Sequence, residues 1–176
     1  MVEERQIFEI KLLPLGDWVK GDAWYWINDA DVCKGILRNI PTTEEENNEW
    51  FKNCFKNKNQ IHKIITANKT PIGMVALRQI DWISRVGELM IFIGDEAHRG
   101  KGFGTKALRM FVKYCFKQLN MHKIFLTVGA DNVTARHLYT KLGFVEEGTF
   151  LDAFYQDGKY INIVKMGLNR ESKELL

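Results

Sequence analysis

The chain has 176 residues and a formal net charge of +3; 45% of its residues are hydrophobic and 27% are charged. This length suffices for one domain with a single hydrophobic core, and the composition is that of a globular protein rather than a disordered or coiled-coil chain. We expect no membrane association, because no segment reaches the roughly 18 apolar residues of a membrane span, and no nucleic-acid partner, because the positive charge is small.

The first predicted elements are a strand and several short helices. The segment 6–13 (QIFEIKLL) reads as a strand that Pro14 ends. Residues 15–37 contain helical pieces that break near Asn28 and Asp29. We therefore expect this part of the chain to cover a sheet rather than to build one.

A longer helix is predicted to begin after Thr43. Thr43 and Glu46 have the spacing of a capping box, in which each side chain hydrogen-bonds the other residue's backbone. The helix should continue to about residue 57. Its apolar side includes Trp50 and Phe51, which fit a ligand pocket and core packing equally well.

Three strands should follow as an antiparallel meander. The apolar segments 62–69, 72–80 and 86–94 are separated by turns at 68–71 and near 83–85. Such short turns connect neighbouring antiparallel strands. This part of the sheet is thus predicted to form locally.

The second half of the chain alternates between helix and strand. Apolar residues spaced for one helix face predict an amphipathic helix over 102–119. A strand at 122–128 and a helix at 131–142 follow. The chain then ends in a hairpin of two strands, about 144–155 and 159–168, around an Asp157-Gly158 turn. This order predicts a mixed sheet with helices on both faces.

The glycine-rich turn Arg99–Thr105 (RGKGFGT) lies between a strand and the amphipathic helix. Its glycines let successive backbone N–H groups converge, and the helix start adds unpaired donors, an arrangement that binds phosphate. It is not a Walker A loop, which needs GxxxxGK[ST], nor a dinucleotide fingerprint, which needs GxGxxG early in a βαβ unit. A turn that merely connects strand and helix is the alternative.

The pattern Arg99-x-x-Gly102-x-Gly104 resembles the acyl-CoA pyrophosphate loop of the GCN5-related N-acetyltransferase (GNAT) family. Residues 132–144 (NVTARHLYTKLGF) resemble that family's second motif, N-x-x-A-x-x-L-Y-x-K-x-G-F. The resemblance covers roughly residues 60–168. Residues 148–166 resemble the branch with ribosomal-protein N-terminal and spermidine acetyltransferases, and 122–144 is also similar to sugar-nucleotide amine acetyltransferases.

The resemblance implies an α/β fold, α+β in some schemes: a mixed, mainly antiparallel sheet of about seven strands with helices on both faces. It also implies acetyl-CoA as co-substrate and no metal. The strand at 90–93 should bulge away from the strand at 122–128, so that pantetheine enters the gap. The implied cofactor-binding residues are Ile91, Phe92, Ile93, Arg99, Gly100, Lys101, Gly102, Phe103, Gly104, Thr105, Asn132 and Lys141.

Acetyl transfer to an amine needs a group that receives the amine proton. Alkyl amines have a pKa near 10.4 and protein α-amines one near 8, so both are mostly protonated at pH 7. Glu88 is the candidate base, because an apolar strand surrounds its carboxylate and because the family often has a basic glutamate at the corresponding place. The alternative is an outward-facing glutamate on an alternating strand.

Tyr139 is the candidate general acid for the departing thiolate. A phenol with a pKa near 10 can protonate a thiolate of pKa near 8.5 while staying protonated itself at pH 7. Spacing alone favours a core aromatic residue, whereas the family motif places its tyrosine near the cofactor sulfur. Asn132, seven residues earlier, fits a helix cap, a pantetheine ligand or both.

The cysteines and histidines give no sign of a metal or a thiol nucleophile. Neither set has metal-ligand spacing, and three cysteines cannot all pair, which favours a reduced cytoplasmic protein. We interpret the histidines as structural. The residues are Cys33, Cys54, Cys115, His62, His98, His122 and His137.

Together these observations predict one N-acetyltransferase domain over 1–176, with acceptor-side elements in 1–60 and the acetyl-CoA-binding core in 61–168. It should transfer acetyl directly, in a ternary complex, to a protein N-terminal α-amine or a small-molecule amine, and a homo-oligomer is a candidate state. Residues 28–39 hold two acidic and two basic side chains, unlike the denser acidic clusters of spermidine acetyltransferases. The alternatives are a non-catalytic acyl-CoA-binding module and, less consistent with the charge, a nucleic-acid accessory domain.

Overall fold

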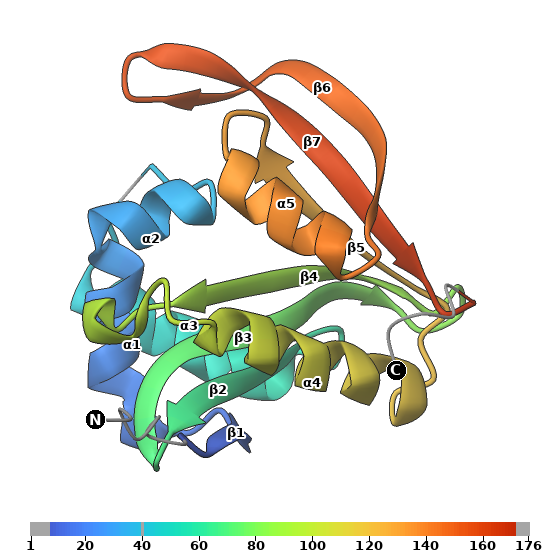
Figure 1. Ribbon diagram of the computed structural model, residues 1–176. Helices are drawn as coiled ribbons and strands as arrows, with labels where there is room; N and C mark the ends of the chain where they lie inside the picture. Colours follow the sequence, from blue (N-terminus) through green and yellow to red (C-terminus); the bar gives the residue numbers. More distant parts are fainter. Residues whose placement is uncertain (1–7, 40, 172–176) are drawn as a thin grey trace, which may run out of the picture.

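The computed structural model describes residues 8–39 and 41–171, and within them the chain forms one seven-stranded sheet (Figure 1). The strand order is β1-β2-β3-β4-β5-β7-β6, and every pairing is antiparallel except that of β4 with β5. The strands are β1 (Ile10–Pro14), β2 (Ile61–Ala67), β3 (Thr70–Asp81), β4 (Val86–Ile93), β5 (Lys123–Gly129), β6 (Val145–Gln156) and β7 (Lys159–Asn169).

Five α-helices and two short 3₁₀-helices complete the described part of the chain. Thr43 caps α3 through the predicted capping box with Glu46. The helices are α1 (Lys20–Asn28), α2 (Ala30–Gly35), α3 (Glu44–Lys56), α4 (Phe103–Lys117) and α5 (Val133–Lys141), and the 3₁₀-helices are Asp17–Val19 and Glu96–His98. The predicted break near Asn28 and Asp29 is confirmed.

Short turns set the register of the hairpins. Asn68 and Lys69 both have positive φ between β2 and β3, as do Asp157 and Gly158 between β6 and β7. Two positive φ values in a row suit the right-handed twist of paired strands. Most boundaries differ from the prediction by one or two residues; in addition, Pro71 lies inside β3, and β1 starts at Ile10 rather than at residue 6, with residues 6 and 7 outside the described part.

The sheet has a separate hydrophobic cluster on each face. One cluster packs α4, with α5 at its margin, against the sheet, and its fully buried members include Phe111 and Leu108. The other packs α1, α2 and α3 against the opposite face, around Phe51, Met74 and Phe92. This arrangement confirms the predicted mixed, mainly antiparallel sheet of about seven strands with helices on both faces.

Candidate active site

The sheet opens at its centre, where β4 and β5 run parallel. They pair over only three positions, the last of which joins Glu88 to Phe125, although β4 continues to Ile93 and β5 to Gly129. The strands therefore diverge beyond Glu88, as predicted. The divergence needs no bulge at residues 90–93, because the pairing of β4 with β3 stays regular from Glu88 to Ile93.

Beside the part of β4 that β5 does not pair lies a cleft of about 830 Å³, which we call the β4–β5 cleft. Its walls come from the free part of β4, the glycine-rich turn, the α2 helix and the start of α5. Of the predicted site residues, the cleft is lined by Ile91, Phe92, Ile93, Arg99, Gly100, Gly102, Phe103, Gly104, Thr105, Asn132 and Tyr139. Glu88, Lys101 and Lys141 are not among its lining residues.

The glycine-rich turn presents bare backbone to this cleft. Gly100 and Gly102 have φ values of 70° and 83°, which residues with a side chain rarely adopt. Among the described residues, no atom lies within 4 Å of where a Cβ would stand at either position. Gly102 precedes α4 and provides no side-chain cap, so the N–H groups of the first turn of α4 are open to a ligand.

These features fit the diphosphate of a coenzyme A molecule. The open donors and the positive end of α4 favour an anion, and a side chain at Gly100 or Gly102 would cover the surface on which it would lie. Phe103 contributes differently: its side chain is 5% exposed and packs in the core, so that it anchors the turn.

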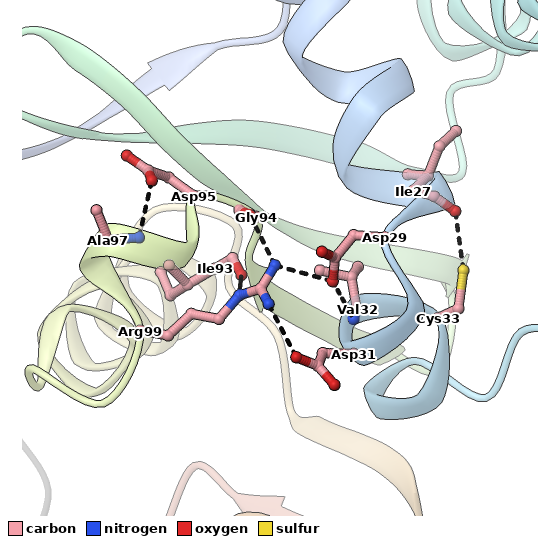
Figure 2. A network of polar contacts seen from close by, with 10 residues as sticks. All are labelled: Ile27, Asp29, Asp31, Val32, Cys33, Ile93, Gly94, Asp95, Ala97 and Arg99. Atoms are coloured by element: carbon pink, nitrogen blue, oxygen red, sulfur yellow. Dashed lines mark hydrogen bonds and ion pairs between the residues drawn. The ribbon is translucent and has the colours of Figure 1, made fainter.

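The guanidinium of Arg99 is engaged by oxygen atoms of other residues (Figure 2). Its Nε donates to the Ile93 carbonyl at 3.1 Å and its Nη2 to the Gly94 carbonyl at 2.8 Å. Its nitrogens also pair with carboxylate oxygens of Asp29, at 2.9 Å, and Asp31, at 3.2 Å. The positive charge expected beside the glycines is thus shared with two carboxylates, and Arg99 joins the end of β4 to the start of α2.

Glu88 lies at the point where the strands part, and its side chain faces inward with 8% of its surface exposed. Its Oε2 accepts hydrogen bonds from Arg78 Nη2 at 3.1 Å and Gln79 Nε2 at 3.2 Å, and its Oε1 accepts one from Thr127 Oγ1 at 3.2 Å. The outward-facing alternative is therefore wrong. Polar donors, rather than the apolar strand alone, form the surroundings of this carboxylate.

A register shift in β3 explains how two consecutive residues reach Glu88. The β3–β4 pairing is interrupted between Arg78 and Asp81, and Gln79 has a positive φ of 49°. In a regular strand, Arg78 and Gln79 would point to opposite faces. The irregularity turns both toward one carboxylate, in keeping with the way bulges redirect side chains.

Tyr139 projects from α5 into the β4–β5 cleft. Its ring packs beside Phe144, with centroids 5.8 Å apart, and borders the hydrophobic cluster under α4. Burial raises the pKa of its phenol to about 12. The core-packing and cleft-lining interpretations are therefore both correct for this residue, and the phenol keeps its proton at neutral pH.

Asn132 caps α5 and lines the same cleft. Its Oδ1 accepts a hydrogen bond from the Ala135 backbone at 3.1 Å, which leaves the side-chain amide hydrogens outside the cap. The cap interpretation is confirmed. Lys101 and Lys141 are exposed, the former beside the glycine turn and the latter in the last turn of α5.

Several residues of this region escaped the sequence analysis because their partners are distant in the chain. Thr127 and Arg78 reach Glu88 from neighbouring strands, and Asp29 and Asp31 reach Arg99 from the acceptor side. Only Asp29 had a local signal, since it follows the helix break and caps α2 through a bond from Val32.

Two features are absent from residues 8–39 and 41–171. No three histidine, cysteine, aspartate or glutamate side chains there gather as a set of metal ligands. No helix in the same part is long and apolar enough to cross a bilayer.

Comparisons with known proteins agree with this geometry. The family described as acetyltransferase (GNAT) domain matches residues 14–145. The spermidine N(1)-acetyltransferase of Vibrio cholerae is 38% identical over 117 residues, which cover 66% of this chain and 67% of that protein. The corresponding enzyme of Escherichia coli is 35% identical over 139 residues, covering 79% and 74%.

A solved structure gives the same result for the fold. The crystal structure of the Vibrio cholerae spermidine N-acetyltransferase in complex with CoA and spermine aligns with a TM-score of 0.89 and 27% identity, over 93% of this chain and 96% of that chain. This chain belongs to the acetyltransferase (GNAT) family. It is an N-acetyltransferase that uses acetyl-CoA as co-substrate and a primary amine as acceptor, and nothing in the comparisons supports the non-catalytic alternative.

Proposed function

We propose that acetyl-CoA lies in the β4–β5 cleft, with its diphosphate on the turn Gly100–Thr105. The open N–H groups of this turn and the positive end of α4 support that position. The backbone of Ile91 and Ile93, which β5 does not pair, would hold the pantetheine arm together with the Asn132 amide. Acetyl-CoA supplies the acetyl group as a thioester, ready for attack by an amine.

Glu88 is proposed to receive the proton of the acceptor amine through a water molecule. The carboxylate lies at the point where β4 and β5 part, outside the lining of the cleft, and is 8% exposed, so a relay suits it better than direct contact. Arg78, Gln79 and Thr127 fix its orientation with three hydrogen bonds. A carboxylate whose orientation is fixed by hydrogen bonds can accept and release protons without moving.

Tyr139 is proposed to protonate the departing coenzyme A thiolate. Its position in the cleft supports this role. Its pKa of about 12 means that the phenol carries its proton at neutral pH, and also that it is a weaker acid than an unburied tyrosine. Arg99 is proposed as a positioning residue that fixes α2 against the end of β4.

One observation carries the proposal: the parting of β4 and β5 leaves free backbone, the glycine turn and Tyr139 around the same cleft. The test is Tyr139→Phe, which keeps the ring and removes the proton donor. We expect thiol release to fall by about 100- to 10,000-fold, as for loss of a general acid, with CoA affinity retained.

The matched control is Tyr114→Phe, on α4 but outside the lining of the β4–β5 cleft, which should keep the wild-type rate. Full turnover by Tyr139→Phe, with chemistry limiting the rate, would contradict the assigned role. If the wild-type protein did not bind CoA at all, the proposed position of the co-substrate would be contradicted.

Three wider proposals follow. Residues 8–60 contribute mainly to the acceptor side and 61–168 to the acetyl-CoA side, with α2 forming a shared wall.

Three free cysteines among the described residues support a cytoplasmic location. The exposed Phe150, Leu151 and Tyr160 on the outer hairpin support a homo-oligomer, and a solved structure of the Vibrio cholerae enzyme is dodecameric.

A further inference from the structure

A second cavity, of about 410 Å³, lies on the face of the sheet that carries α1, α2 and α3. We call it the His62 pocket. Most of its wall is apolar, from Trp50, Met74, Met90 and Phe92 among others. Its polar lining includes His62 and Arg78, and neither the proposed binding of acetyl-CoA nor the proton transfers involve His62.

The strand register leads from this pocket to Glu88. His62 pairs with Ala76, which pairs with Met90, so these three side chains share one face of the sheet. Arg78 and Glu88 form the next paired row on that face. Ordinary strand spacings separate His62 from Glu88 by roughly 12 Å. An amine whose reacting end lay near Glu88 would thus extend its other end toward His62.

His62 is buried without a polar partner. It is 8% exposed, and among the described residues neither ring nitrogen has a hydrogen bond. Its ring meets the edge of Trp50 with centroids 5.2 Å apart. Burial and the nearby Arg78 lower the pKa of the imidazole to about 4, so that it is neutral at pH 7. It then offers one donor and one acceptor.

Arg78 adds a third unmatched atom, since its Nε is also buried without a partner in the described part of the chain. The unmatched atoms are thus two N–H donors and one acceptor nitrogen beside a mainly apolar wall. An aliphatic hydroxyl or a carboxamide can accept a hydrogen bond from the Arg78 Nε–H and also bond one ring nitrogen of His62, as donor or as acceptor. An ammonium group cannot accept from Arg78, because it only donates.

The charged residues that line the pocket offer little to attract a polycation. Arg78 is paired with Glu88, and the carboxylate of Glu46 already accepts the Thr43 backbone N–H at 2.8 Å. Asp29 and Asp31, at the start of α2, are paired with Arg99. A second ammonium group would thus meet, among the described lining residues, one carboxylate that a backbone N–H already engages.

We propose that the His62 pocket selects the acceptor: a primary amine whose apolar body carries a hydroxyl or carboxamide at its far end, in preference to a polyamine. This inference rests on the proposed function, since it places the reacting amine beside Glu88. His62 and Arg78 are the specificity-determining residues, and Trp50 contacts the apolar body.

Three amines of equal length test this selection: aminohexanol, diaminohexane and hexylamine, with spermidine and an aminohexanamide alongside. We expect kcat/KM for aminohexanol to exceed that for diaminohexane by about tenfold or more, the effect of one well-made hydrogen bond against an unmatched charge. In His62→Phe, the ratio of kcat/KM for aminohexanol to kcat/KM for diaminohexane should shrink several-fold. The kcat/KM for hexylamine should rise. The control His122→Phe alters an exposed histidine and should leave the ratio unchanged.

Titration of the wild-type protein with the same amines, in the absence of acetyl-CoA, gives a readout that does not need the variant to fold. Tighter binding of aminohexanol than of diaminohexane or hexylamine supports the proposal. Preference for diaminohexane or spermidine, or equal treatment of all amines, overturns it. If no amine releases thiol, the proposed function fails instead, and the titration alone decides on the pocket.

Discussion

The β4–β5 cleft and the His62 pocket are built from different parts of the chain. The cleft presents backbone N–H groups, positive-φ glycines and a helix start, whereas the His62 pocket presents side chains from α1, α3, the segment after α2 and three strands. Backbone recognition depends on a short local pattern, so related enzymes can share it while their acceptors differ. Side-chain recognition depends on distant residues, and there a few substitutions can change the acceptor. The proposed co-substrate and acceptor sites thus depend on largely different residues.

The largest expected effect is that of Glu88→Gln, because Glu88 lies at the point where β4 and β5 part and is proposed to receive the amine proton. The amide keeps the shape and removes the charge. We expect kcat to fall by about 100- to 1,000-fold at pH 7, with CoA affinity unchanged, and to recover partly at high pH as the free amine increases. A wild-type rate at pH 7 would show that Glu88 does not receive the amine proton. The proposed placement of the acceptor between Glu88 and His62 would then lose its support.

The next effect concerns the stability of the His62 pocket. The pKa of His62 is about 4 in the folded protein against 6.5 as its ordinary value, so the unfolded chain takes up the proton first as pH falls. The free energy of unfolding should therefore decline between pH 6.5 and 4, by up to roughly 3 kcal/mol from this group.

Urea unfolding of wild type and His62→Phe across that pH range measures the difference. The variant should lack this part of the acid destabilisation, since it cannot bind the proton. Parallel stability curves for the two proteins would show that His62 is not buried in its neutral form.

Arg99→Met tests whether the wall shared by both cavities depends on one guanidinium. Its loss leaves two carbonyls and the carboxylates of Asp29 and Asp31 without their partner. Because these groups are partly solvated, we expect a loss of about 1–2 kcal/mol in unfolding free energy and a several-fold weaker CoA affinity from the uncompensated acids. Arg99→Lys should restore part of the affinity. Unchanged calorimetric binding in both variants would contradict a positioning role.

The smallest expected effect is that of Lys101→Ala. The side chain is exposed beside the glycine turn, where a point charge is screened by salt. CoA affinity should fall by about two- to fivefold at low ionic strength and less at high salt. Lys117→Ala, at the far end of α4, is the matched control. A large loss of CoA affinity at high salt would mean that the charge of this side chain, rather than the backbone N–H groups, provides most of the binding in the cleft.

The parts of this molecule that sequence could predict depend on neighbours in the chain. The capping box at Thr43, the Asp157-Gly158 turn and the amphipathic α4 each follow from residues a few positions apart. The same holds for the open turn at Gly100 and Gly102, and most of the residues that line the β4–β5 cleft were predicted for this reason.

The remaining features depend on strand register and on contacts between distant segments. The irregularity at Gln79 carries no sequence signal, yet it turns two donors toward Glu88. The pairing of Arg99 with Asp29 joins residues far apart in the chain. His62 was interpreted as a structural histidine from its lack of ligand spacing, and only its burial without a partner distinguishes it.

The three residue pairs that join β4 to β5 give the sheet a natural hinge. On one side lie β1 to β4, and on the other β5, β7 and β6. Antiparallel strand pairing holds each half together. A small tilt of one half against the other would widen the mouth between them while every ladder stayed intact. Departure of the spent coenzyme could then proceed by flexing at Val86–Glu88, within the limits set by the hydrophobic cluster under α4, which contains residues of both halves.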